Sequence, residues 1–275
     1  MDKLRIGLKL APQFTTAAEL HAVWQIADEA GFDHFASICA RGYLGDVFEG
    51  WTLLGAMAEA TSRVRIGSMV TGNTYRHPGV LAKMAVTVDH LSGGRLEFGL
   101  GAAWADNEHT MLDLEFGTAG QRIARMEEAC RMIKLLWSQD RTSFDGEHYR
   151  LVDAVANPKP IQRPGPPIWI GGSGERKTLR VVAEHADVWN LASGEVDEAV
   201  RLSGVLDEHC AAVGRDPASV GRSVQLFYTD AEALLREAEA FATNGFRELI
   251  VGVRPGTAQS DAAAVAEVLP QLRSL

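Results

Sequence analysis

The sequence has little cysteine, and this shortage excludes most metal and disulfide scaffolds. Its 275 residues include three cysteines, Cys39, Cys130 and Cys210. They are scattered and odd in number, and their spacing matches neither a zinc motif nor a disulfide framework. We therefore expect no bound metal, and a protein of the reducing cytoplasm.

Positive charge is also scarce. The chain has 27 basic and 36 acidic side chains, a net charge of −9, and no run of Lys or Arg that could follow a phosphate backbone. We expect no nucleic acid partner.

Long apolar runs are missing as well. No stretch approaches the roughly 20 apolar residues of a membrane-spanning helix, and the initial residues MDKLRIGLKLAP lack the apolar segment of a signal peptide. We therefore expect a cytoplasmic protein that does not contact a membrane. The apolar fraction of 46% and the charged fraction of 23% are typical of a globular protein with a large core.

The most informative stretch spans residues 64–108. Residues 64–71 form a short apolar, β-branched run, and a helical pattern follows from Pro78 until Ser92. A second apolar run, residues 95–101, comes directly after it. Strand, crossover helix and strand in so short a span indicate a βαβ unit of a parallel sheet.

The same alternation continues through the whole chain. Further strands are predicted at residues 5–10, 34–39, 166–172, 187–192, 223–228 and 247–253. Further helices are predicted at residues 16–30, 51–61, 122–138, 173–186, 196–213, 230–244 and 261–272, with an accessory excursion at 144–151. Eight strands alternating with eight helices predict an α/β fold, a (β/α)8 TIM barrel formed as a single domain by residues 1–275; a doubly wound open sheet is the alternative.

In such a barrel the active site lies beyond the carboxyl ends of the strands, which limits the candidate histidines. Of the eight histidines, His77 and His109 follow predicted strand ends. Each has two open interpretations: a functional side chain, or an ordinary residue at a helix start or on a loop surface.

A glycine-rich loop joins the strand at 166–172 to the next helix. It consists of Gly171, Gly172, Ser173 and Gly174. Free backbone N–H groups at a helix amino terminus can bind phosphate, and the following Arg176 and Lys177 favour this interpretation. The alternative is a tight turn without a ligand. The small residues GLGAA at 99–103 form a second strand end, where a flat ring could approach the backbone.

Several motifs together resemble a known family. They are RHP at 76–78, SGGR at 92–95, NEH at 107–109 and PPIWIGG at 166–172. With their surroundings across most of residues 1–192, they resemble the luciferase-like monooxygenase superfamily, and within it the oxidoreductases that depend on the deazaflavin coenzyme F420.

The resemblance implies a homodimeric barrel that holds F420, or alternatively flavin mononucleotide (FMN), with the ring near the second to fourth strands. It implies a non-prolyl cis peptide between Ser68 and Met69 behind the ring. Contacts to the coenzyme are implied for Thr71, Ala102 and Asn107, and phosphate binding for the glycine loop, including Gly172, Ser173 and Gly174.

One position departs from the family pattern. Members commonly carry an Asp-His pair at the end of the second strand, and that His is the usual acid or base; this chain has Cys39 and Ala40 there. Because alanine cannot transfer a proton, we expect His109 or Glu108 of the NEH motif to supply any acid–base function.

Three functions follow from these observations. The first is an oxidoreductase that transfers hydride between reduced F420 and a small organic substrate, with the coenzyme supplying the chemistry. The second is a monooxygenase that uses reduced FMN and oxygen. The third, suggested by Ala40, is a flavin- or deazaflavin-binding protein with little turnover.

Overall fold

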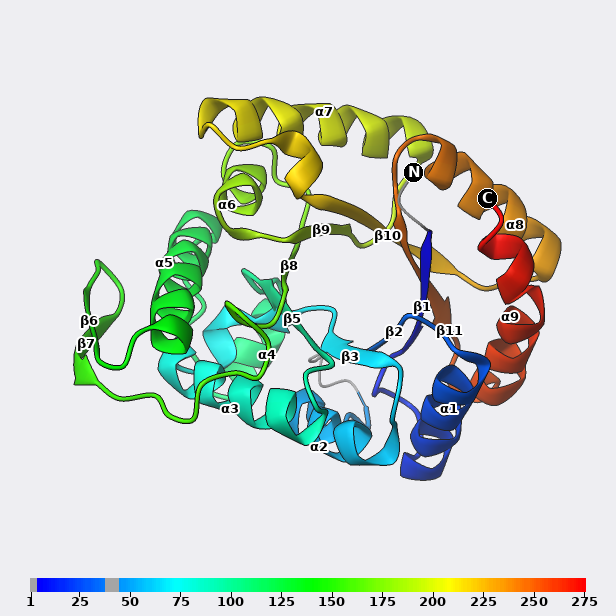
Figure 1. Ribbon diagram of the computed structural model, residues 1–275, viewed down its shortest axis with the longest axis horizontal. Coiled ribbons are helices and arrows are strands. Elements are labelled where there is room, and N and C mark those ends of the chain that lie inside the picture. Colours follow the sequence, from blue (N-terminus) through cyan, green and yellow to red (C-terminus); the bar gives the residue numbers. More distant parts are fainter. Residues whose placement is uncertain (1–3, 38–44) are drawn as a thin grey trace.

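Parallel strands close into a ring at the centre of the computed structural model, which describes residues 4–37 and 45–275 (Figure 1). The ring consists of β1 (Arg5–Leu10), β2 (His34–Ser37), β3 (Arg65–Ser68), β4 (Thr71–Gly72), β5 (Leu96–Gly101), β8 (Ile168–Gly171), β9 (Val188–Leu191), β10 (Gly221–Phe227) and β11 (Glu248–Val253). Of these nine segments, β3 and β4 share one position because both pair with β5, so the barrel has eight strand positions.

The ring is closed by parallel pairing between its first and last strands. Leu8 of β1 pairs with Phe35 of β2 on one side and with Val251 of β11 on the other. The predicted TIM barrel is therefore confirmed, and the open-sheet alternative is wrong.

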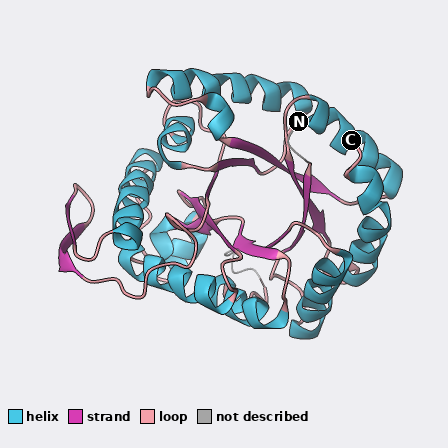
Figure 2. Cartoon of the chain, in the orientation of Figure 1, coloured by secondary structure: helices cyan, strands magenta, loops and turns pink. Residues whose placement is uncertain are grey.

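Helices form a layer around the barrel (Figure 2). They are α1 (Ala17–Ala30), α2 (Gly50–Ala60), α3 (Pro78–Leu91), α4 (Asp106–Met111), α5 (Ala119–Ser138), α6 (Thr178–His185), α7 (Val196–Ala212), α8 (Ala231–Thr243) and α9 (Ala258–Leu272), with the short 3-10 helices η1 (Asn73–Tyr75) and η2 (Pro217–Ser219). Within the described residues, no helix is both long and apolar enough to cross a membrane.

Local capping explains where the helices begin and end. Thr16 caps α1 by accepting from the Glu19 backbone N–H, and Gly31 ends it with a φ of 80°. Helix α5 begins three residues before the predicted start because Thr118 and Gln121 form a capping box. These signals fix the loops that surround the barrel mouth.

Two apolar layers hold the barrel together. Strand residues that point outward pack against the helices, among them Leu8, Ile66, Phe98 and Ile168. Inside the barrel, Ile250 packs with Ala36, Met69, Trp169 and Val188. All five of these strand residues, the four that point outward and Ile250, are buried, but Ile250 fills the barrel interior, whereas the other four lie between sheet and helices.

Charged residues close the amino-terminal end of the barrel. His34 Nε2 lies 2.7 Å from Glu248 Oε2, and Arg5 Nη1 donates to Glu248 Oε1 at 2.8 Å. Beside them, Arg65 Nε donates to Glu97. Since these ion pairs fill one end, a ligand must enter from the carboxyl end.

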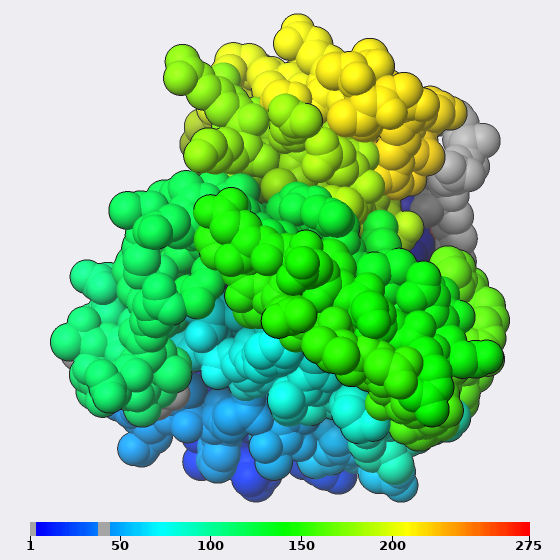
Figure 3. Space-filling model, turned by 90° about the vertical axis from the view of Figure 1, so that its left-hand side faces the viewer, coloured from blue at the N-terminus to red at the C-terminus, as the bar shows by residue number. Residues whose placement is uncertain are grey.

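The predicted excursion is an antiparallel hairpin of β6 (Thr142–Asp145) and β7 (Arg150–Ala154). Figure 3 looks onto the side that carries it and shows its residues in green between the cyan and yellow-green helices. The buried Glu128 of α5 fixes the turn by accepting from the backbone N–H groups of Glu147, His148 and Tyr149.

Candidate functional site

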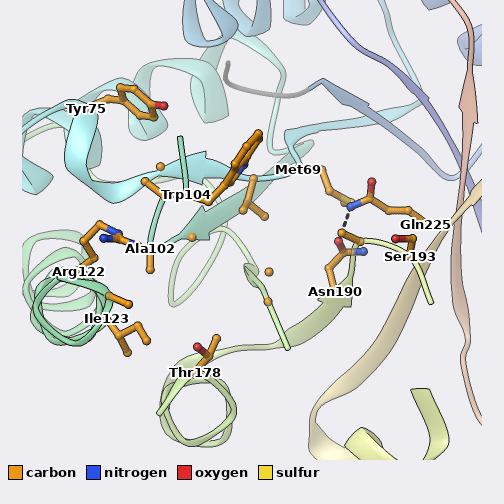
Figure 4. Close-up of a pocket in the computed structure, with 18 of the residues that line it drawn as sticks. Met69, Tyr75, Ala102, Trp104, Arg122, Ile123, Thr178, Asn190, Ser193 and Gln225 are labelled. Carbon is orange, nitrogen blue, oxygen red and sulfur yellow. Dashed lines mark hydrogen bonds between the residues drawn. The ribbon is translucent and has the colours of Figure 1, made fainter. Parts of the chain in front are cut away.

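A cavity of about 380 Å³ opens at the carboxyl end of the barrel (Figure 4). Its walls come from β1, β4, β5, β8, β9 and β10, from the residues that follow β3 and β5, and from the first turns of α5 and α6. It lies where the barrel fold places active sites.

The charge of the cavity is opposite to that of the protein. Among the described residues that line it, Lys9 and Arg122 are charged, and both are positive. The whole chain carries −9. A cationic cavity in an acidic protein favours an anionic ligand.

One end of the cavity is suited to phosphate. Arg122, from the first turn of α5, lines this end together with Thr178 and Gly172. The guanidinium of Arg122 lies 3.7 Å over the Phe116 ring and donates from Nη1 to the Gly117 carbonyl at 2.7 Å. Its Nε is buried and makes no hydrogen bond in the described part of the chain, so the protein does not satisfy every donor of this guanidinium.

The glycine loop contributes only its first half to this end. Gly171 and Gly172 line the cavity, whereas Ser173 and Gly174 are exposed and lie outside the lining. Helix α6 begins at Thr178, not at the predicted Ser173, because three turn residues intervene. The loop therefore does not form the first turn of the helix, and Thr178, which the sequence analysis missed, occupies the place next to the cavity.

The predicted cis peptide is displaced by one residue. The non-prolyl cis bond joins Met69 to Val70, so its assignment to Ser68–Met69 is wrong. The Met69 backbone N–H still donates to the Ser37 carbonyl at 2.7 Å, which keeps the preceding peptide in the strand ladder. Met69 and Val70 line the cavity, while Ser68 is buried and its hydroxyl donates to the Gly99 carbonyl at 3.0 Å.

Glycines make room for Val70 and for the Ser68 backbone on the side of the cavity that Met69 and Val70 line. A Cβ at Gly101 would lie 2.7 Å from Val70 Cγ2, and one at Gly171 would lie 3.1 Å from it. At Gly99 a Cβ would lie 1.8 Å from the Ser68 carbonyl oxygen. The small residues at 99–103 therefore accommodate the backbone and side chain behind the cavity, and Gly101 also forms part of its surface.

The three other predicted contact residues are placed differently from one another. Ala102 lines the cavity. Thr71 is buried outside the lining, where its hydroxyl accepts from Trp51 Nε1 and from Arg76 Nη1, both at 3.2 Å. Asn107 is exposed in the first turn of α4 and does not line the cavity.

Glu108 and His109 are fully buried behind Tyr75. His109 donates from Nδ1 to the Ala105 carbonyl at 2.7 Å, its Nε2 lies 2.6 Å from the Thr74 hydroxyl, and its ring lies 4.8 Å from the Tyr75 ring. Tyr75 lines the cavity and donates its hydroxyl proton to Glu108. Glu108 and His109, the predicted acid–base residues, do not line the cavity, because Tyr75 lies between these two residues and the cavity.

The other histidine at a strand end has a structural role. His77 caps α3, where its Nδ1 accepts from the Gly79 backbone N–H at 3.1 Å. The helix-start interpretation of His77 is therefore confirmed. Cys39 and Ala40 lie outside the described residues.

A buried polar network forms the end of the cavity opposite Arg122. Lys9 of β1 donates to Gln225 of β10, whose Nε2 donates to Asn190 Oδ1 at 2.7 Å. Asn190 Nδ2 in turn donates to the Ser223 hydroxyl at 2.9 Å. This network was not predicted from the sequence, although a lysine inside an apolar strand is a visible signal.

One group of possible metal ligands lies away from the cavity, within the described residues. Glu127, Glu184 and His185 bring ligand atoms within 4.8 Å of one another. Both carboxylates already pair with arginine, Glu127 with Arg131 and Glu184 with Arg180, so we assign this group to the packing of α5 against α6.

Comparisons with known proteins agree with the fold. Residues 5–272 match the family model described as luciferase-like monooxygenase. An F420-dependent glucose-6-phosphate dehydrogenase of Microbacterium testaceum is 33% identical over 77% of this chain and 64% of its own length. An FMNH(2)-dependent dimethylsulfone monooxygenase of Pseudomonas putida is 29% identical over 81% of this chain and 63% of its own length.

The fold also matches a solved structure over almost its full length. An F420-dependent secondary alcohol dehydrogenase in complex with an F420-acetone adduct superposes with a TM-score of 0.90, covering 99% of this chain and 100% of the other, at 18% identity. With the family match across nearly the whole sequence, these findings lead to one conclusion: the chain belongs to the luciferase-like monooxygenase family, whose members include flavin- and F420-dependent oxidoreductases.

Proposed function

We propose that this protein is an F420-dependent oxidoreductase that transfers hydride between reduced deazaflavin and a small organic substrate. The observation that carries the proposal is the cationic cavity at the carboxyl end of the barrel, lined by small residues on one wall. The F420-dependent relatives support it.

The residues present fit a phosphorylated coenzyme. Arg122 and the hydroxyl of Thr178 would hold the phosphate, together with the backbone of Gly172 and the amino terminus of α5. Met69 and Val70 would support one face of the ring. Trp104, which is 68% exposed and lines the cavity, would cover the ring from the solvent side.

When bound, the coenzyme would supply or accept the hydride. The protein would bind and orient both reactants and handle the proton. We keep His109 or Glu108 as proposed sources of acid–base function. Glu108 would act through the Tyr75 hydroxyl, which donates to it, whereas His109 lies against the Tyr75 ring.

A second candidate is an FMN-dependent monooxygenase. The phosphate end suits FMN as well as F420, and the Pseudomonas relative uses reduced FMN by its name. A binding protein with little turnover is the third candidate, because Ala40 stands where the family commonly has histidine.

Single-turnover reactions would separate these functions. The protein is mixed without oxygen with reduced F420 and a panel of small ketones and aldehydes, and the return of the oxidised coenzyme's absorbance is followed. The proposal predicts protein-dependent oxidation of reduced F420 with at least one substrate. Turnover with reduced FMN and oxygen alone would favour the monooxygenase, and binding without any turnover would favour the third candidate.

We also propose a cytoplasmic homodimer, which rests on the family resemblance and the scattered cysteines. Light scattering of the purified protein would test the dimer, and a monomer at micromolar concentration would contradict it.

A further inference from the structure

The cavity has two chemically different ends. Figure 4 shows Arg122, Ile123 and Thr178 on one side, and Asn190, Ser193 and Gln225 on the other. If the first end holds the coenzyme phosphate, as the proposed function requires, the second cation, Lys9, lies at the other end of the cavity.

Lys9 is an unusual residue for its position. It belongs to β1, where its backbone pairs with Ala36 and Gly252, and Lys9 as a whole is only 7% exposed. A buried lysine inside a barrel loses hydration, which is costly unless polar groups surround it. Such a group is retained where its charge serves a purpose, and this one borders the candidate site.

A chain of amides positions the amine. Gln225 accepts from Lys9 Nζ and is itself held by Asn190, which is anchored by Ser223; Asn190, Gln225 and Ser223 are all buried. On its other side, Nζ lies 5.9 Å from the centroid of the Phe227 ring at the mouth. The network fixes the ammonium between the buried interior and the opening of the cavity.

We propose, as the alternative to His109 or Glu108, that Lys9 binds the substrate oxygen on which negative charge develops and gives it a proton. This inference rests on the proposed function. In the reduction of a carbonyl, the carbonyl carbon gains hydride with its electron pair from the reduced coenzyme, and the π pair moves onto oxygen. That oxygen takes a proton from the Lys9 ammonium, which becomes a neutral amine and regains a proton from water.

This role explains how the chain functions with Ala40 at the usual position of the proton donor. β1 neighbours β2 in the barrel, so Lys9 reaches the site from the adjacent strand. The amine reaches the cavity directly, whereas Glu108 and His109 lie behind Tyr75.

Acetate binding tests Lys9 without turnover. Acetate is a small carboxylate whose oxygens stand in for the charged substrate oxygen, and its binding to protein saturated with oxidised F420 is measured by calorimetry. We expect Lys9→Met to weaken acetate binding by about tenfold or more, because a charge-assisted hydrogen bond is lost. Lys9→Arg should retain most of the affinity, and Lys9→Met should weaken the binding of neutral acetamide much less than that of acetate.

The matched control is Lys83→Met, which removes an exposed lysine of α3. It should leave acetate binding unchanged. Gln225→Leu, which removes the acceptor that positions Lys9, should weaken acetate binding less than Lys9→Met does. If Lys9→Met does not fold, Gln225→Leu and Lys9→Arg still decide the question, because unchanged acetate affinity in Gln225→Leu would contradict the positioning network.

Turnover gives an independent measurement. With reduced F420 and a ketone that the wild type reduces, Lys9→Ala should lose roughly 10²–10³-fold in the rate of the single turnover. Added methylammonium should restore part of that rate, which a purely structural role would not allow. Loss of rate without such rescue, together with unchanged acetate binding, would overturn the inference.

Failure of the proposed function would be visible separately. If wild-type protein does not bind F420, the same acetate titration is made on the free protein. Equal acetate affinity in wild type and Lys9→Met then contradicts the role of Lys9, whereas weaker binding in Lys9→Met supports an anion site at this end of the cavity whatever the coenzyme.

Discussion

The Tyr75 side chain separates the cavity from two buried polar residues. Its ring lies against His109, and its hydroxyl donates to Glu108, which has no exposed surface. A hydrogen bond to a buried carboxylate stabilises the fold, and its removal leaves the carboxylate with fewer donors.

Tyr75→Phe tests this arrangement. We expect it to lower the free energy of unfolding by about 1–3 kcal/mol, measured by urea denaturation. If Glu108 acts on the substrate through Tyr75, then Tyr75→Phe and Glu108→Gln should also reduce turnover by similar factors. Tyr228→Phe, which lies outside the cavity lining, is the control. Full turnover in both Tyr75→Phe and Glu108→Gln would exclude an acid–base role for Glu108.

At this scale the sequence predicted some site residues but not others. Gly171, Gly172, Ala102 and Met69 line the cavity. The two glycines follow from a strand end that is visible in the sequence, whereas Ala102 and Met69 were implied by the family resemblance. Lys9, Tyr75 and Thr178 were missed because their side chains reach the cavity through pairings and turns that depend on distant parts of the chain. The placement of Asn107 on the surface depends on where α4 begins, which the sequence does not specify.

The connection from α2 to β3 depends on one carboxylate of α1. Asp28 accepts from the backbone N–H groups of Ser62, Arg63 and Val64, and from the Ser62 hydroxyl. Burial alone would raise the pKa of Asp28, but these hydrogen bonds outweigh it and lower the pKa to about 2. Asp28 therefore joins α1 to the start of β3.

The lowered pKa makes this contribution depend on pH. Because the folded-state pKa lies below the unfolded value of about 3.9, the stabilisation is fully present above pH 4 and is lost as the pH falls towards 2. We expect Asp28→Asn to lower the free energy of unfolding by about 2 kcal/mol at pH 7, and the difference from wild type to shrink towards pH 2. Denaturation curves at several pH values, with the exposed Asp140→Asn as control, would check this. An equal difference at pH 7 and pH 2.5 would contradict it.

Glycines in different elements should respond differently to an added methyl group. Gly204 lies in α7 with open space around its Cβ direction, so Gly204→Ala should stabilise the protein by about 0.5–1 kcal/mol. Gly101→Ala should destabilise it, because its Cβ would lie 2.7 Å from Val70, and should also weaken coenzyme binding. Thermal unfolding of the two variants would show opposite shifts, and an unchanged or raised melting temperature in Gly101→Ala would contradict the role of Gly101.

The glycine loop shows how an element boundary changes a site. Gly174→Asp is a poor test of phosphate binding, because a Cβ at Gly174 would lie 2.7 Å from Thr178 Oγ1 and would disturb the start of α6. The glycine pattern predicted the loop correctly. The turn at residues 175–177, which moves the helix start to Thr178, carries no comparable signal in the sequence.

Residues that stabilise the fold and residues that line the cavity lie at opposite ends of the barrel. The ion pairs of Arg5, His34 and Glu248 lie at the amino-terminal end, and the cavity lies at the carboxyl end. This separation is general in barrels of this type.

Glu248→Gln should therefore affect folding and not binding. Removing the buried charge takes away the nearer carboxylate of His34 and Arg5, although both still lie within 3.6 Å of Glu97, so the free energy of unfolding should fall by about 1–3 kcal/mol. Coenzyme affinity should stay the same. Urea denaturation and a coenzyme titration on the same variant would check both, and a large loss of affinity in folded protein would contradict the separation.

At the scale of the whole molecule, the sequence predicted the architecture well. Alternating strand and helix patterns are local, so residues such as those of β5 and α3 could be assigned to their elements. Closure of the sheet depends on pairing between β1 and β11, about 240 residues apart, and no local pattern encodes it. The prediction of a barrel over an open sheet rested on the count of units and on the family resemblance.

The most direct test of the central claim is a fluorescence titration of the purified protein with oxidised F420. We predict saturable binding of one coenzyme per chain. Arg122→Met should weaken that binding by about tenfold or more, because the charged contact to phosphate is lost. Arg125→Met, which changes an arginine of the same helix that pairs with Glu115 outside the cavity lining, should bind like the wild type. Absence of saturable binding, or equal affinity in wild type and Arg122→Met, would contradict the assignment of this cavity as the coenzyme site.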